Sequence, residues 1–207
     1  MSSPGTPTTT SYAILGLLAI QSWSTYELTQ QMDRSLGRMW PRAQSKLYEE
    51  PKKLVALGYA TATVEQVGKR PRTVYTITDE GRIALSQWLE EPGAGPVLEF
   101  EQLLKLSFAE HGSRADARNT VAAVKDWAIE RNVENLHAAR QYADGEGPFQ
   151  RRAAQGMLAG AFFTDFYAMV SRWADWASQQ IENWPDDPAD AKPDPAVLDD
   201  IHRRAQW

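Results

Sequence analysis

Helical spacing of apolar residues predicts two short helices close to the N-terminus. Residues 1–9 are rich in Ser, Thr, Pro and Gly and are expected to form a mobile tail. Thr10 or Ser11 can cap the first helix, and Ser24 or Thr25 the second. Each of these side-chain oxygens can accept a hydrogen bond from a backbone N–H group of the first helical turn.

A third helix is expected over residues 41–57, where Leu47, Leu54 and Leu57 mark the buried side. Proline suits the first turn of a helix, and Gly58 suits the left-handed position that follows a helix end. Pro51 lies inside this helix and cannot donate a hydrogen bond to the carbonyl of Leu47. We therefore expect a kink at Pro51.

The pattern changes to the alternation of strands after the third helix. Residues 59–67 and 73–77 are rich in threonine and valine and predict a two-stranded ribbon. Residues 68–72 form the turn between them and carry Lys69, Arg70 and Arg72. Thr78 can then cap a fourth helix, which ends at the Glu-Pro-Gly of residues 91–93.

Every periodic segment beyond residue 96 is helical. Helices are expected over residues 98–109, 113–142 and 149–183, with a short closing segment over 196–204. Ser113 is a suitable cap for the second of these helices. The helix over 149–183 carries two adjacent apolar stripes. One stripe consists of Leu158, Phe162, Phe166, Met169, Trp173 and Trp176, and the other of Ala159, Phe163, Tyr167 and Val170. So wide an apolar surface needs covering on more than one side, so we expect a second subunit in a homodimer.

Three helices, a ribbon and a cationic ribbon tip together predict a winged helix-turn-helix. In this arrangement the third helix enters the major groove of double-stranded DNA, and the ribbon tip reaches the flanking backbone or the minor groove. The residues expected to contact DNA are Arg42, Gln44, Ser45, Lys46 and Tyr48 on the third helix and Lys69, Arg70 and Arg72 on the ribbon. The competing interpretation is a winged helix that binds a protein partner without binding DNA.

Four groups of residues resemble the PadR family of bacterial transcriptional regulators. They are residues 12–18 (YAILGLL), residues 24–28 (STYEL), Leu47-Tyr48 with Leu54 and Gly58-Tyr59, and residues 72–81 (RTVYTITDEG). The resemblance implies a homodimer, usually a repressor, with a C-terminal helical region. Residues 50–51, Glu-Pro, depart from the family pattern, in which the third helix is unbroken.

Charge divides the chain in the same way as the predicted elements do. Residues 1–83 hold four lysines and six arginines against seven acidic residues, a net charge of +3. The remainder carries −8, which gives the total of −5. A basic first part and an acidic second part suit a DNA-facing module joined to a module that does not bind DNA.

The expected fold class is therefore mainly α, with four parts along the chain. They are a flexible tail over residues 1–9, a winged helix DNA-binding domain over 10–91, an all-α dimerisation domain over 97–183, and a Pro-rich tail over 184–207. No apolar run is long enough to cross a membrane, so we expect a soluble, cytoplasmic protein with no membrane partner.

Aromatic residues of the second half form a candidate site for a small effector. Trp127, Phe162, Phe166, Trp173 and Trp176 could line a pocket for a planar hydrophobic ligand that relieves repression. The alternative is that these side chains form core, as aromatic stripes at helical spacing usually do. The family resemblance favours a ligand, because some PadR relatives respond to phenolic acids or to planar drugs.

The chain lacks the residue patterns of an enzyme. It has no cysteine, which excludes disulfides, thiolate metal sites and thiol catalysis. His111, His137 and His202 stand far apart in the sequence, without a second ligand at metal-binding spacing. No phosphate loop, dinucleotide fingerprint or Gly-x-Ser-x-Gly motif is present. We expect neither catalysis nor a cofactor.

Overall fold

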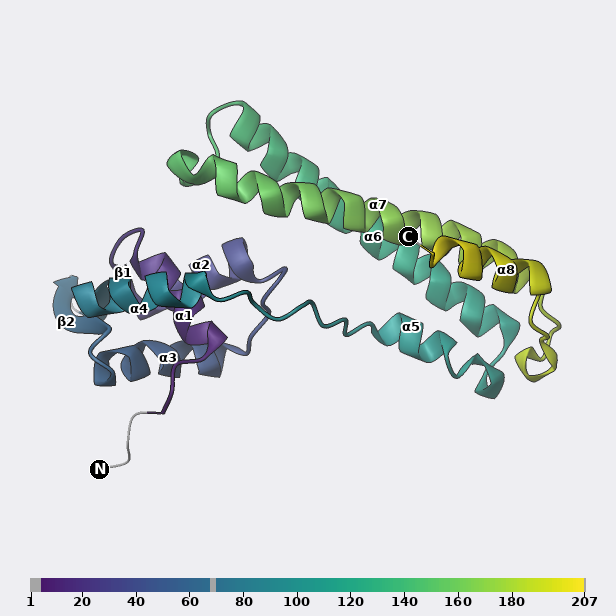
Figure 1. The fold of residues 1–207 in the computed structure, drawn as a ribbon, viewed down its shortest axis with the longest axis horizontal. Helices are drawn as coiled ribbons and strands as arrows, with labels where there is room; N and C mark the ends of the chain where they lie inside the picture. The colour runs from purple at the N-terminus through teal and green to yellow at the C-terminus, as the bar shows by residue number, and fades with distance from the viewer. Residues whose placement is uncertain (1–4, 68–69, 207) are drawn as a thin grey trace. The chain divides into compact units, whose positions relative to one another are not determined.

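The computed structural model describes residues 5–67 and 70–206, without the side chains of Val67 and Arg70. The predicted DNA contact Lys69 therefore lies outside the described residues, as does the side chain of Arg70. The chain forms two compact units that divide between Pro96 and Val97 (Figure 1). Each unit has its own core.

The first unit combines four α-helices with a small antiparallel sheet. Its elements are α1 (Thr9–Leu18), β1 (Trp23–Ser24), α2 (Thr25–Gln31), the π-helical turn η1 (Met32–Leu36), α3 (Gln44–Ala56), β2 (Ala60–Val67), β3 (Arg70–Ile77) and α4 (Asp79–Glu90). The sheet has the order β1-β3-β2. Its core is closed by fully buried side chains from α1, α2, η1 and α3: Ile14, Leu15, Leu18, Leu28, Met32 and Leu54.

Local capping chemistry explains where most of these helices begin. Ser24 accepts from the Glu27 backbone N–H while the Glu27 carboxylate accepts from the Ser24 backbone, so a capping box starts α2 as predicted. Thr78 caps α4, also as predicted. The first helix differs, because Thr8 rather than Thr10 or Ser11 is its cap, with Ser11 completing the box.

Two further features of the first unit differ from the sequence predictions. The third helix begins at Gln44, so Pro41 and Arg42 precede the helix instead of lying in its first turn. Residues 23–24, for which no strand is predicted, form the short strand β1 beside Tyr75 and Val74 of β3. Pro51 is buried inside α3, which extends to Ala56.

Two glycines are required by the backbone around the strands. Gly58 has a φ of +76°, which is the left-handed conformation expected after the end of α3. Gly81 lies in the first turn of α4, where a Cβ atom would come within 2.1 Å of the Tyr59 carbonyl oxygen. The close approach of α4 to the chain that leaves α3 therefore depends on a residue without a side chain.

The second unit is built on a pair of long helices. Its elements are α5 (Glu101–Leu106), the 3-10 turn η2 (Ala109–His111), α6 (Arg114–Ala143), η3 (Gln150–Arg152), α7 (Ala153–Glu182), η4 (Pro188–Asp190) and α8 (Pro195–Arg204). Helices α6 and α7 run side by side along their length (Figure 1). Ser113 starts α6 in a capping box with Asp116, as its position in the sequence predicts. The segment expected as one helix over 98–109 is the shorter α5 followed by η2.

Small residues bring α6 and α7 close together. The buried contact consists of Ala117, Val121, Val124 and Ala128 from α6 and Val170, Ala174, Ala177 and Ile181 from α7. Four of these eight side chains are alanine, so the two backbones can approach closely without leaving a gap. Among the helices of the described residues, none is both long and apolar enough to traverse a bilayer.

Candidate DNA-binding surface and aromatic groove

The start of α3 presents a row of polar side chains to solvent. Arg42, Gln44, Ser45, Lys46 and Tyr48, the residues predicted to contact DNA on this helix, are all exposed. Leu47, in their midst, is buried and fixes the orientation of the helix. The residue at the cap position, Ala43, has no side-chain hydrogen bond to offer, so the positive end of the helix faces outward without a capping side chain.

Trp40 holds Arg42 in place. The Arg42 guanidinium lies 4.0 Å from the centre of the Trp40 ring, and its Nη1 donates to the Pro41 carbonyl at 2.6 Å. The Trp40 indole Nε1 in turn donates to Thr10 Oγ1 at 3.0 Å, which anchors the ring to α1. Sequence reasoning identified Arg42 but missed Trp40. The signal was a tryptophan two residues before an arginine at a helix start.

A second anchor lies in the middle of α3. The Glu50 carboxylate accepts from Ser11 Oγ at 2.5 Å and from Thr8 Oγ1 at 3.5 Å. Ser11 is fully buried, so this carboxylate ties the middle of α3 to the first turn of α1. Both residues of the Glu-Pro pair that departs from the family pattern are thus held in place. The Pro51 ring is buried, and the Glu50 carboxylate accepts the hydrogen bond from Ser11.

A cleft of about 390 Å³ separates the start of α3 from α2 and η1. Its walls include Tyr26, Gln30, Trp40, Arg42, Gln44 and Tyr48. The cleft is lined by aromatic rings and by polar side chains with both donors and acceptors. Base edges and phosphates are recognised by groups of this kind.

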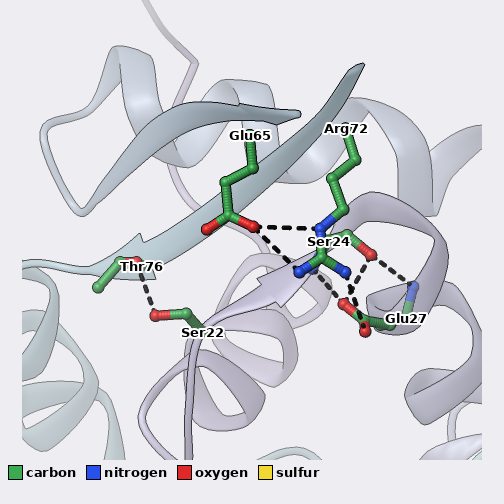
Figure 2. A network of polar contacts seen from close by, with 6 residues as sticks. All are labelled: Ser22, Ser24, Glu27, Glu65, Arg72 and Thr76. Carbon is green, nitrogen blue, oxygen red and sulfur yellow. Dashed lines mark hydrogen bonds and ion pairs between the residues drawn. The ribbon is translucent and has the colours of Figure 1, made fainter. Parts of the chain in front are cut away.

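The strands β2 and β3 form the wing, residues 60–77 without the undescribed 68–69. Arg72, predicted to lie in the wing turn and to contact phosphate, is instead a residue of β3 and lies directly opposite Glu65 in the antiparallel register. Its Nε and Nη2 donate to Glu65 Oε2 at 3.2 and 3.0 Å, and its Nη1 lies 3.7 Å from Glu27 Oε1 (Figure 2). The structure therefore places Arg72 between two carboxylates.

Glu27 belongs to both the helix cap and the wing. Hydrogen bonds from the Ser24 side chain and backbone lower the pKa of the Glu27 carboxyl, and the charge of Arg72 lowers it further. Ser24 is itself a residue of β1. Two residues before Ser24, Ser22 Oγ lies 2.7 Å from Thr76 Oγ1. A second polar contact therefore joins the chain that leads into β1 to β3 (Figure 2).

The two apolar stripes of α7 have different surroundings. The stripe that contains Phe163, Tyr167 and Val170 is buried against α6. In the other stripe, Leu158 is 77% exposed and Phe162 59% exposed within this chain. Exposed apolar residues of α6, among them Ile129, Val133 and Leu136, add to the uncovered surface of this unit.

The five predicted effector residues fall into two groups. Trp127 contacts Phe166 edge-on at 6.3 Å between ring centres, and Phe162 stacks on Phe166 at 6.2 Å. Trp173 and Trp176 instead border a groove of about 280 Å³. The remaining walls of this groove, which we call the tryptophan groove, are Leu103, Leu106, Ser107, Ala177, Gln180, Ile181 and Trp184. Sequence reasoning missed Trp184 and the contribution of α5, because neither belongs to the helical stripe.

Comparison with known proteins places this architecture in a family. The family model described as the transcriptional regulator PadR-like family matches residues 14–87. The negative transcriptional regulator PadR of Bacillus subtilis (strain 168) is 37% identical over 108 residues, which are 51% of this chain and 59% of that protein. The match thus spans less than two thirds of that relative.

Two solved structures are similar over most of the chain. The crystal structure of Bacillus subtilis PadR in complex with operator DNA has a TM-score of 0.68 and 25% identity, over 84% of this chain and 99% of that one. The crystal structure of the same protein in complex with p-coumaric acid has a TM-score of 0.65 and 24% identity, over 84% of this chain and 95% of that one. The mainly α winged-helix fold predicted from the sequence is confirmed.

The predicted class of protein is confirmed by the same findings. Apart from residues 12–13, the residues that carried the resemblance lie within the region 14–87 that the family model matches. Proteins of this family are regulators of transcription and not enzymes. Residues 14–87 of this chain therefore form a domain of the PadR-like family of transcriptional regulators.

Proposed function

We propose that the chain acts as a homodimeric repressor that binds a specific DNA operator. The observation that carries this proposal is the start of α3, where Arg42, Gln44 and Lys46 are exposed around the buried anchor Leu47. The similar Bacillus subtilis protein is a negative regulator whose structure is known with operator DNA, which supports the same activity here.

Roles within the surface follow from side-chain chemistry. Arg42 and Gln44 can each form paired hydrogen bonds with the edge of a base, which gives sequence specificity. Ser45, Lys46 and Tyr48, with Lys69 and Arg70 of the wing, suit phosphate oxygens, which are the same in every sequence. Trp40 limits the freedom of Arg42 before DNA arrives and so lowers the entropy lost on binding.

Homodimerisation is supported by the uncovered apolar surface of the second unit. Leu158, Phe162 and Met169 of α7 lie on one stripe and are all exposed in the single chain. A second copy that packs on this stripe would remove it from water. Two copies would also place two recognition helices on two half-sites of an operator.

The tryptophan groove is the site we propose for a small effector. Trp173, Trp176 and Trp184 offer planar surfaces, and Leu103, Leu106 and Ile181 complete apolar walls. None of the described residues that line the groove is charged. A neutral planar aromatic compound therefore suits it better than a carboxylate such as the p-coumaric acid bound by Bacillus subtilis PadR.

Replacing base-contacting and phosphate-contacting residues should affect DNA binding in different ways. Arg42→Ala or Gln44→Ala should reduce the difference in binding free energy between operator and random duplex by about 1–3 kcal/mol, because each removes contacts with a base. Lys69→Ala should lower the affinity for both duplexes alike, because it removes one phosphate contact. The slope of log affinity against log salt concentration should fall by about one. Fluorescence anisotropy titrations of the dimer at four salt concentrations measure all of these quantities.

The matched control for these variants is Arg82→Ala on α4. Arg82 is exposed but lies outside both the start of α3 and the wing, so its removal should change neither the specificity nor the slope by a comparable amount. Affinity that does not change between low and high salt would refute DNA binding by this surface.

A neutral planar ligand such as 2-naphthol should quench the tryptophan emission of the chain. Trp173→Leu should weaken this ligand about threefold to tenfold, because stacking on an indole contributes about 0.5–1.5 kcal/mol beyond the area it buries. Trp88→Leu is the control, since Trp88 stacks on Tyr12 in the other unit and should leave the affinity unchanged. If the ligand lowers the affinity for operator DNA, operator DNA must lower the affinity for the ligand by the same factor. Equal affinities of the wild type and of Trp173→Leu for 2-naphthol would exclude the tryptophan groove as the binding site.

A further inference from the structure

Arg72 has the chemistry of a phosphate contact but the surroundings of a structural link. Its guanidinium uses Nε and Nη2 on Glu65 and directs Nη1 toward Glu27 (Figure 2). The two carboxylates come from different elements, because Glu65 is on β2 and Glu27 is on α2. One planar side chain therefore spans the wing and the helix-turn-helix.

The Glu27 carboxylate is fixed independently of Arg72, whereas for Glu65 it is the backbone that is fixed, in the wing. Glu27 Oε2 accepts from the Ser24 backbone N–H at 2.8 Å and from Ser24 Oγ at 2.7 Å, which holds the carboxylate at the start of α2. Glu65 is the cross-strand partner of Arg72 in the wing. A guanidinium held at both ends by anchored groups restricts how far the wing can swing from α2.

Charge also argues against a direct role on DNA. Glu27, Glu65 and Arg72 together carry a net charge of −1, so the group as a whole repels a phosphate. A phosphate contact by Arg72 would require its guanidinium to leave two carboxylates. The three side chains are between 41% and 45% exposed, so their ion pairs add little to the stability of the fold. Their effect is on position.

We propose that Arg72 is a positioning residue, which fixes the wing against α2 so that the wing turn and α3 reach one duplex together. The restriction of the wing is a property of the free protein. Its consequence for DNA rests on the function proposed above, so the two are tested separately.

The position of the wing can be measured directly in the free protein. The chain has no cysteine, so spin labels can be attached at Gln66→Cys on β2 and Ser35→Cys on η1, both exposed positions. We expect a narrow distance distribution by pulsed electron resonance, which Arg72→Gln should broaden. Lys52→Gln is the control, because it breaks another exposed ion pair, with Glu49, that does not connect two elements. A distribution that Arg72→Gln leaves unchanged would overturn the proposal.

Three variants then separate positioning from phosphate contact in DNA titrations. Arg72→Gln should lower operator affinity about fivefold without changing the salt slope, whereas loss of a phosphate contact would reduce that slope by about one. If Arg72 positions the wing, the Arg72→Lys variant should bind the operator as weakly as Arg72→Gln, since one ammonium cannot span both carboxylates. If Arg72 instead contacts a phosphate, the Arg72→Lys variant should keep the affinity of the wild type. Glu65→Gln should also lower the affinity, and the double variant with Arg72→Gln should be no weaker than either single variant.

The contrary results are equally specific. A rise in affinity in Glu65→Gln, together with a smaller slope in Arg72→Gln, would assign Arg72 to the phosphates and refute the positioning role. If no duplex binds the wild-type protein, the proposed function fails, while the label distances still decide whether Arg72 restrains the wing. Circular dichroism of each variant verifies that the fold is intact.

Discussion

Removing the helical unit should lower affinity for the operator by about 10²–10⁴-fold. A chain truncated after Pro96 keeps α3 and the wing but loses the surface that we propose for dimerisation. In a dimer, the second α3 binds its half-site from a high effective concentration, and this advantage vanishes when the subunits separate. The truncated chain should still fold, because its buried residues from α1, α2 and α3 contact one another within the first unit.

Analytical ultracentrifugation and operator titrations of both chains test this expectation. Phe162→Glu in the full-length chain is a milder version of the same change, because Phe162 is 59% exposed in one subunit and its replacement should unfold neither unit. Gln179→Glu adds the same charge at another exposed position of α7 and should leave the dimer intact. A full-length chain that is monomeric at micromolar concentration would rule out the dimer. The expected loss of operator affinity on truncation would then have no basis.

Helix starts could be predicted because a cap depends on neighbours in the sequence. Ser24, Thr78 and Ser113 each cap the helix expected of them, since the side chain and the N–H group it binds are three residues apart. The strand β1 could not be found in the same way. Its two residues form a strand only because β3, fifty residues later, supplies their hydrogen-bond partners.

The candidate site was predictable in composition but not in contacts. The cations at residues 42, 69, 70 and 72 are visible in the sequence, but the partner of Arg72 on α2 is 45 positions away and follows only from the fold. Periodicity likewise located both stripes of α7 without indicating which one faces α6. The structure answers this through the alanines that follow the second stripe, Ala174 and Ala177, which allow the close approach.

Leu54→Ala should destabilise the first unit by about 2–5 kcal/mol, which is a large part of the stability of a domain of this size. Leu54 is 0% exposed and lies two helical turns after the buried Leu47, so both side chains belong to the face of α3 that packs on the core. Alanine would lose the burial of three carbon atoms and leave a cavity that α1 and α2 can fill only in part.

Leu89→Ala makes the same chemical change on α4, where Leu89 is 68% exposed, and should alter the free energy of unfolding by less than about 0.5 kcal/mol. Urea unfolding of both variants in the chain truncated after Pro96 compares them without the second unit. The loss in Leu54→Ala should appear as a lower midpoint at an unchanged slope with urea concentration. Equal losses in the two variants would mean that α3 is not anchored by this face, and the orientation of Arg42 and Gln44 derived from it would be wrong.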